Sequence, residues 1–166
     1  MRKGTHVGIV TATLRALEGE FGCRPADMLV GVGPCIGADC YEVGEDVAGL
    51  FREAFPTATA NGFTNVPHNK TVKGTRNETG GATGMRMGVC CSQRAQEGFQ
   101  ILRDIGGGKS LLDLRGANVL QLLDGGVLPE HITVSGLCPH CHPELFFSHR
   151  GMGAVRGGMA AFLGLI

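Results

Sequence analysis

The sequence has 166 residues, enough for one domain whose hydrophobic core needs neither disulfides nor a structural metal. Lysine plus arginine equals aspartate plus glutamate at 15 each, so no net charge attracts a nucleic acid backbone or an anionic membrane. No apolar run reaches the roughly 18 to 20 residues of a membrane span, and no secretion signal opens the chain. We therefore expect a cytoplasmic protein that binds neither nucleic acid nor membrane.

The cysteine content is also consistent with a cytoplasmic protein. The chain has seven cysteines, an odd number, and Cys90 and Cys91 are adjacent, which is a poor arrangement for a mutual disulfide. Because no secretion signal is present, we expect these thiols to be reduced.

The first third of the chain predicts a helix, a strand and a second helix. Apolar residues three and four positions apart predict a helix over residues 6–20, closed by Gly22 in a left-handed cap. Residues 28–32 are a short apolar run before Gly33-Pro34, which predicts a buried strand that leads into a tight loop. A second helical stripe runs from Val47 to Ala54 and should end near Pro56, since proline cannot continue the hydrogen-bond ladder.

The middle of the chain has a different composition. Residues 57–88 are rich in glycine, threonine and asparagine with little apolar periodicity, which predicts a long, partly disordered loop. Residues 95–105 are compatible with a short helix before the flexible break Gly106-Gly-Gly108. Segment 57–110 as a whole is interpreted as a long glycine-rich insertion or loop within a single domain, 1–166.

The last third predicts a strand over 111–114, a helix over 117–123, a strand over 132–134 and a terminal strand over 160–166. Gly125-Gly126 should end the helix. Because strands and helices alternate, the fold class expected is α/β, with helices covering a mostly buried sheet.

Two motifs carry cysteine. Gly33-Pro-Cys-Ile-Gly37 forces a tight turn that exposes backbone N–H groups, and Cys35 is either a thiol polarised by a helix N-terminus or a buried, unreactive side chain. Cys138-Pro-His-Cys-His142 has the spacing of a haem attachment site or of half a zinc site, although no second Cys-x-x-Cys pair exists in the chain.

The same C-terminal region contains histidines and an arginine. His140, His142 and His149 are candidates for a general base or a metal ligand, or they are surface residues. Arg150 follows Phe146-Phe-Ser-His149, and a guanidinium there could bind phosphate or carboxylate with two hydrogen bonds, or form an ordinary surface ion pair.

Three separated blocks together resemble the laccase-domain family, which is also called polyphenol oxidase-like or purine nucleoside phosphorylase-like. The blocks are Gly33-Pro-Cys-Ile-Gly37 with Cys40-Tyr-Glu-Val-Gly44, Leu112-Asp-Leu114 with Asn118 and Gln121-Leu122, and Ser135-Gly-Leu-Cys138 running to Phe146-Phe-Ser-His-Arg150. Gly157 to Ala161 resembles the end of the family's closing Thr-Gly-Arg-Met-Ala pattern. The matching portion is the family's C-terminal part.

The resemblance implies a layered sandwich of mixed β-sheets flanked by helices, incomplete at its N-terminus. It also implies phosphorolysis of adenosine, inosine and methylthioadenosine, deamination of adenosine, and dependence on zinc or copper. The family's metal ligands are two histidines and a cysteine that precede the block beginning at Arg2-Lys-Gly-Thr5, so no metal ligand is assigned in this chain. Lys3 stands where the family has an arginine.

Three functional hypotheses follow from these observations. In the first, the chain belongs to an enzyme acting on purine nucleosides and phosphate, with Lys3, Gly33, Pro34, Cys35 and Arg150 as substrate-binding residues. In the second, it is a non-catalytic remnant or interaction module that keeps the fold, and exposed apolar faces lead it to self-associate. In the third, Cys138, Cys141, His140 and His142 form a metal-binding module.

Overall fold

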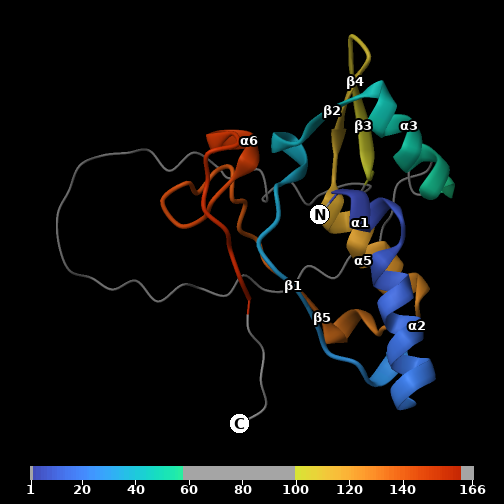
Figure 1. Ribbon diagram of the computed structural model, residues 1–166. Helices are drawn as coiled ribbons and strands as arrows, with labels where there is room; N and C mark the ends of the chain where they lie inside the picture. Colours follow the sequence, from blue (N-terminus) through green and yellow to red (C-terminus); the bar gives the residue numbers. More distant parts are fainter. Residues whose placement is uncertain (1, 58–99, 162–166) are drawn as a thin grey trace.

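The computed structural model describes residues 2–57 and 100–161, in which short strands alternate with helices (Figure 1). The helices are α1 (Arg2–His6), α2 (Ile9–Phe21), α3 (Glu45–Ala54), α5 (Leu114–Asp124) and α6 (His149–Met152). The strands are β1 (Val30–Val32), β2 (Glu42–Gly44), β3 (Leu102–Gly106), β4 (Lys109–Leu112) and β5 (Ile132–Val134). Short 3-10 turns are η1 (Pro25–Asp27), η2 (Ala38–Cys40) and η3 (Pro129–His131).

The strands form two small sheets of opposite type. β1 pairs in parallel with β5, so that Val30 lies opposite Ile132. β2, β4 and β3 form an antiparallel sheet in which β4 is central and Val43 lies opposite Ser110. The mixed α/β architecture expected from the sequence is therefore confirmed.

Helix α5 lies between the two sheets and connects two hydrophobic clusters (Figure 1). Leu114, Ala117 and Leu120 face a cluster built around Phe51 of α3. Val119 and Leu122 face the second cluster, which contains Leu14, Val127 and Ile132. Because α5 presents apolar side chains to both clusters, most of its residues are buried.

Asp113 lies between β4 and α5 and caps the helix. Its side chain accepts a hydrogen bond from the Gly116 backbone N–H at 2.8 Å, which is the usual way to cap a helix N-terminus. Burial raises the pKa of the Asp113 carboxyl, and the Gly116 hydrogen bond acts in the opposite direction. This cap explains why the strand predicted over 111–114 ends at Leu112 and why the helix predicted over 117–123 begins earlier, at Leu114.

The helix predicted over residues 6–20 is interrupted near its start. Gly8 adopts a left-handed conformation with φ of 75°, which separates α1 from α2. The predicted left-handed cap at Gly22 is confirmed, with φ of 64° and a hydrogen bond from its N–H to the Glu18 carbonyl. The apolar stripe on α2 is not fully buried, since Leu14 is in the core but Phe21 is 75% exposed.

The strand predicted over 28–32 is present as β1, but it is not buried as expected. Leu29 is 81% exposed, and Gly31 is also exposed. Among residues 2–57 and 100–161, β1 has β5 as its hydrogen-bonded neighbour on one edge and no strand on the other. A strand paired on a single edge is covered less completely than a central strand.

The helix predicted over 95–105 is wrong in its described part, because Leu102 to Gly106 form β3. Gly106, Gly107 and Gly108 all have positive φ, from 62° to 83°, and they turn the chain directly into β4. The glycine run is therefore a hairpin turn rather than a flexible break. The end of the proposed 57–110 loop is thus ordered, while residues 58–99 lie outside the described ranges.

At the C-terminus, residues 160 and 161 are not in a strand, and the rest of the predicted strand over 160–166 is not described. In the described parts of the chain, no helix has both the length and the apolar character required to cross a membrane.

Candidate functional site

The turn from Gly33 to Gly37 follows β1 and packs between α5 and the C-terminal loops. The Cys35 side chain is only 2% exposed and belongs to the hydrophobic cluster around Phe51. The Cys35 carbonyl accepts a hydrogen bond from Arg115 Nη2 at 3.1 Å. The Gly37 N–H donates to Cys138 Sγ at 3.2 Å. Hydrogen bonds to Arg115 and to Cys138 thus hold the turn in place, and the Gly37 N–H already has a hydrogen-bond acceptor.

Burial decides the chemistry of Cys35. It raises the pKa of the Cys35 thiol from 9.0 to about 11, against the opposing influence of the nearby Arg115. Near neutral pH the side chain is therefore a neutral thiol. Of the two interpretations of this motif, the structure supports the buried, unreactive thiol, and any contact of Cys35 with a substrate would have to involve its backbone.

We predict that Cys35 resists alkylation in the folded protein. A rise of the pKa from 9.0 to about 11 lowers the thiolate fraction at pH 8 about 100-fold, and burial blocks the reagent as well. Iodoacetamide labelling followed by peptide mass spectrometry should show Cys35 modified slowly in buffer and rapidly in urea. The half-buried Cys23 is the internal comparison, and equal labelling rates for Cys35 and Cys23 in buffer would contradict the prediction.

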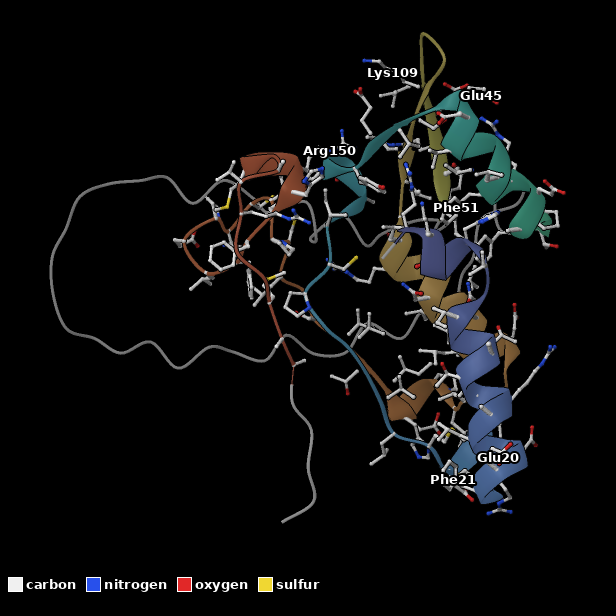
Figure 2. All side chains as sticks on the ribbon, viewed as in Figure 1. Glu20, Phe21, Glu45, Phe51, Lys109 and Arg150 are labelled. Carbon is white, nitrogen blue, oxygen red and sulfur yellow. The ribbon has the colours of Figure 1, made fainter. Side chains whose placement is uncertain are left out.

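Arg150 lies on α6, which brings it against the segment that follows η2 (Figure 2). Its Nη2 donates to the Glu42 carbonyl at 2.6 Å, and its Cζ lies 5.2 Å from the centre of the Tyr41 ring. Ser148 caps α6 by accepting a hydrogen bond from the Gly151 N–H at 3.4 Å. The guanidinium is exposed and held in place by a hydrogen bond and a cation–π contact.

Three cysteines meet beside this segment. The Sγ atoms of Cys40, Cys138 and Cys141 all lie within 4.8 Å of one another. Cys40 and Cys141 are 101 positions apart in sequence, yet their sulfur atoms are 3.4 Å apart. Cys138 is fully buried, Cys40 is half-buried and Cys141 is exposed, so the group reaches the protein surface on one side.

The histidines of the C-terminal region are not part of this group. His142 Nδ1 lies 3.1 Å from Glu144 Oε1, and His149 Nδ1 lies 2.9 Å from the Gly153 carbonyl oxygen. Within the described ranges, the three cysteines are the one set of three or more potential ligands whose ligand atoms lie this close together. Of the residues in the predicted metal-binding module, Cys138, Cys141, His140 and His142, the structure places the two cysteines together with Cys40 and not with the histidines.

The structure brings part of the predicted substrate-binding set together. Gly33, Pro34 and Cys35 are contiguous in the turn, and Arg150 contacts Tyr41 and Glu42, a few residues beyond it. Lys3 is exposed on α1, whose neighbours are α2, α3 and α5. A shared role for these five residues in substrate binding stays a prediction.

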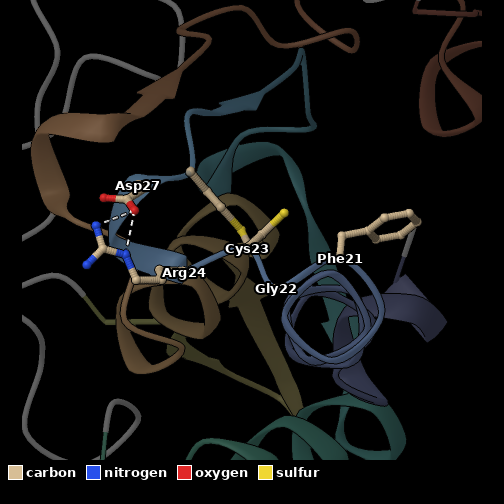
Figure 3. Close-up of a pocket in the computed structure, with 6 residues that line it drawn as sticks. Phe21, Gly22, Cys23, Arg24 and Asp27 are labelled. Atoms are coloured by element: carbon tan, nitrogen blue, oxygen red, sulfur yellow. Dashed lines mark hydrogen bonds and ion pairs between the residues drawn. The ribbon is translucent and has the colours of Figure 1, made fainter.

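Two open hollows lie beside α2. One, of about 520 Å³, is at the end of α2, where Arg24 and Asp27 form an ion pair of 2.6 Å (Figure 3). The second, of about 570 Å³, lies between α2 and β1 and is mostly apolar, with Gly33 and Asn118 in its lining. Of the predicted substrate-binding residues, Gly33 lines the second of these two hollows.

The mixed α/β fold and the ordered blocks at the turn, at α5 and at the C-terminal loop define a known class of protein. The sequence matches the family described as "Multi-copper polyphenol oxidoreductase laccase" over residues 2–78 and 83–166. The chain therefore belongs to this family.

Relatives within the family bear a more specific name. "Purine nucleoside phosphorylase LACC1" of Mus musculus is 26% identical over 98% of this chain and 29% of its own length. "Purine nucleoside phosphorylase YlmD" of Geobacillus stearothermophilus is 29% identical over 98% of this chain and 45% of its own length. The chain thus spans less than half the length of these relatives.

Solved structures agree with the fold. The crystal structure of YlmD from Geobacillus stearothermophilus superposes with a TM-score of 0.62 at 28% identity, covering 91% of this chain and 42% of that one. The Bacillus licheniformis hypothetical protein YfiH superposes with a TM-score of 0.60 at 26% identity, covering 90% and 42% respectively.

The family description names copper. Copper(II) sites are typically rich in imidazole, as in the two-histidine, one-cysteine set of blue copper proteins. The donor group in the described ranges consists of three thiols and no histidine. These residues do not fit a histidine-ligated copper centre.

Sequence reasoning missed Cys40, Tyr41 and Arg115 as residues of this region. Cys40 and Tyr41 belong to a block that carries the family resemblance. The block was therefore recognised from the sequence, but the contacts that these two side chains make were not. Arg115 lies next to the Asp113 cap and reaches the Cys35 carbonyl across 80 positions, a contact that no local pattern indicates.

Proposed function

We propose that this chain is part of a purine nucleoside phosphorylase. The observation that supports the proposal best is that relatives bearing this name align with 98% of the chain, even though it spans less than half of their length. The exposed Arg150 guanidinium, fixed on Tyr41, adds a cationic group suited to an anionic substrate.

The chemistry needs such a group. In phosphorolysis an oxygen of inorganic phosphate attacks the C1′ atom of the nucleoside, the C1′–N bond breaks, and its electron pair leaves with the purine, which takes up a proton. The sugar develops positive charge during this step, so an enzyme must hold the phosphate dianion close to C1′ in a fixed orientation. A guanidinium with two parallel N–H donors can hold phosphate in this way.

In this proposal Arg150 binds phosphate, and the backbone of the Gly33 to Cys35 turn contributes to the wall of the site. Lys3 supplies a second positive charge from α1. Adenosine, inosine and methylthioadenosine are the proposed substrates, and deamination of adenosine is a further activity to be measured in the same samples.

The test is the release of free purine base by the purified chain, measured by liquid chromatography with and without inorganic phosphate. We expect base release from inosine and adenosine that requires phosphate. Conversion of adenosine to inosine in the same chromatograms reports deamination. Base release at the same rate without phosphate, or no release from any of the three nucleosides, would contradict the proposal.

We further propose that the chain self-associates through the face formed by α2 and β1. Val7, Ile9, Phe21 and Leu29 are all more than half exposed, and Ile9 and Leu29 line the apolar hollow of about 570 Å³. Within the described residues, one edge of β1 also carries no paired strand. An apolar surface next to an open strand edge favours contact with a second copy.

Multi-angle light scattering across a concentration series should therefore show species larger than a monomer. Leu29→Glu places a charge in the middle of this face and should shift the distribution toward monomer. Val155→Glu is the matched control, because Val155 is 94% exposed and lies outside the face. A wild-type chain that stays monomeric at all concentrations would overturn this proposal.

A further inference from the structure

We propose that Cys40, Cys138 and Cys141 bind one zinc(II) ion and leave its fourth position open toward solvent. This inference does not depend on nucleoside phosphorolysis. It rests on the positions of the three sulfur atoms, on the turn that holds Cys138 and Cys141, and on the Gly37 N–H that donates to Cys138 Sγ.

The sulfur positions suit tetrahedral thiolate coordination. A zinc–sulfur bond of about 2.3 Å places two thiolates of one tetrahedral ion about 3.8 Å apart. The three Sγ atoms lie within 4.8 Å of one another, and the Cys40–Cys141 pair is at 3.4 Å. Both values are close to the spacing that a common ion requires.

The backbone around Cys138 resembles that of a two-cysteine metal turn. Cys138 and Cys141 are separated by two residues, and the Cys138 carbonyl accepts hydrogen bonds from the N–H groups of Cys141 and His142, both at 3.1 Å. This turn places both thiols on the same side. The Gly37 N–H donates to Cys138 Sγ at 3.2 Å, and such N–H donors stabilise the thiolate form that zinc requires.

The three cysteines differ in burial, and an ion can reach them from solvent. Cys138 is fully buried and anchors the group, whereas Cys141 is exposed, so solvent reaches the ligands from the Cys141 side. A zinc ion with three protein ligands takes water or another small ligand in its fourth position, as in sites that are not purely structural. The bound ion would tie η2 to the C-terminal loop, next to the Tyr41–Arg150 contact.

The test is the zinc content of the chain purified under reducing conditions after growth with added zinc, measured by inductively coupled plasma mass spectrometry. We expect one zinc per chain in the wild type and a large loss in Cys40→Ser and Cys141→Ser. Cys23→Ser is the matched control, because Cys23 is half-buried and outside the group. A Cys90→Ser/Cys91→Ser double variant controls for the two cysteines outside the described ranges.

Two further readouts do not depend on zinc counting. Cobalt(II) added to the metal-free chain should give the near-ultraviolet charge-transfer band of thiolate ligands, and this band should be absent in Cys141→Ser. A chelator should lower the melting temperature of the wild type and leave that of Cys40→Ser unchanged.

Three results would overturn the proposal. The first is a wild-type zinc content no higher than that of Cys40→Ser. The second is loss of zinc in the Cys90/Cys91 variant with retention in Cys141→Ser, which would place the metal elsewhere. The third is a chain that retains copper(I) and excludes zinc, which would refute the tetrahedral zinc assignment.

Discussion

Replacing Phe51 with alanine should lower the free energy of unfolding by about 3–5 kcal/mol, the usual cost of removing a buried aromatic ring. Phe51 is 0% exposed and lies at the centre of the cluster shared by α3, α5 and the antiparallel sheet. Its ring also packs against Phe55, with ring centres 5.8 Å apart. Removal leaves a cavity between elements that cannot close without moving α3.

The measurement is urea unfolding followed by circular dichroism on the wild type and the variant. Leu50→Ala is the control on the same helix, because Leu50 is 44% exposed and alanine keeps helix propensity. We expect a loss of about 1 kcal/mol or less for Leu50→Ala. Equal losses for the two variants would mean that the cluster around Phe51 is not the principal core.

Replacing Arg150 with alanine should lower kcat/KM for phosphate about 100-fold, the scale expected when one charged donor to a reacting anion is removed. The effect should appear mainly as a raised KM for phosphate, with a smaller change in the KM for nucleoside. Arg150→Lys keeps the charge but loses the planar fork and the stacking on Tyr41, so we expect it to recover part of the loss.

Arg156→Ala is the control for loss of positive charge, because Arg156 is also exposed and lies in the same C-terminal segment. Its kinetic constants should match those of the wild type. If Arg150→Ala also behaved like the wild type, Arg150 would have no role in phosphate binding, and its contact with Glu42 would be purely structural.

Elements defined by local patterns were predicted well from the sequence. The strand at 132–134 and the helical stripe from Val47 to Ala54, which lies within α3, were found because their apolar residues repeat with the period of the element. The left-handed cap at Gly22 followed from the same reasoning, since glycine is the residue that adopts this conformation without strain.

The failures have a common physical origin in contacts between distant segments. The helix expected over 95–105 was wrong because β3 pairs with β4, and β4 pairs in turn with β2 from the first third of the chain, a sheet that the local apolar pattern does not show. Cys40 joins Cys138 and Cys141 through folding across about 100 residues. The Cys-x-x-Cys motif indicated a possible metal site, but Cys40, the third cysteine of the group, could not be found from spacing.

Phosphorus NMR of the purified chain with inosine and inorganic phosphate tests the central claim, that this chain is part of a purine nucleoside phosphorylase, most directly. We predict that the phosphate signal falls while that of ribose 1-phosphate rises, with one hypoxanthine released for each sugar phosphate formed. Hypoxanthine appearing without any sugar phosphate, or an unchanged spectrum with active relatives as positive control, would contradict phosphorolysis by this chain.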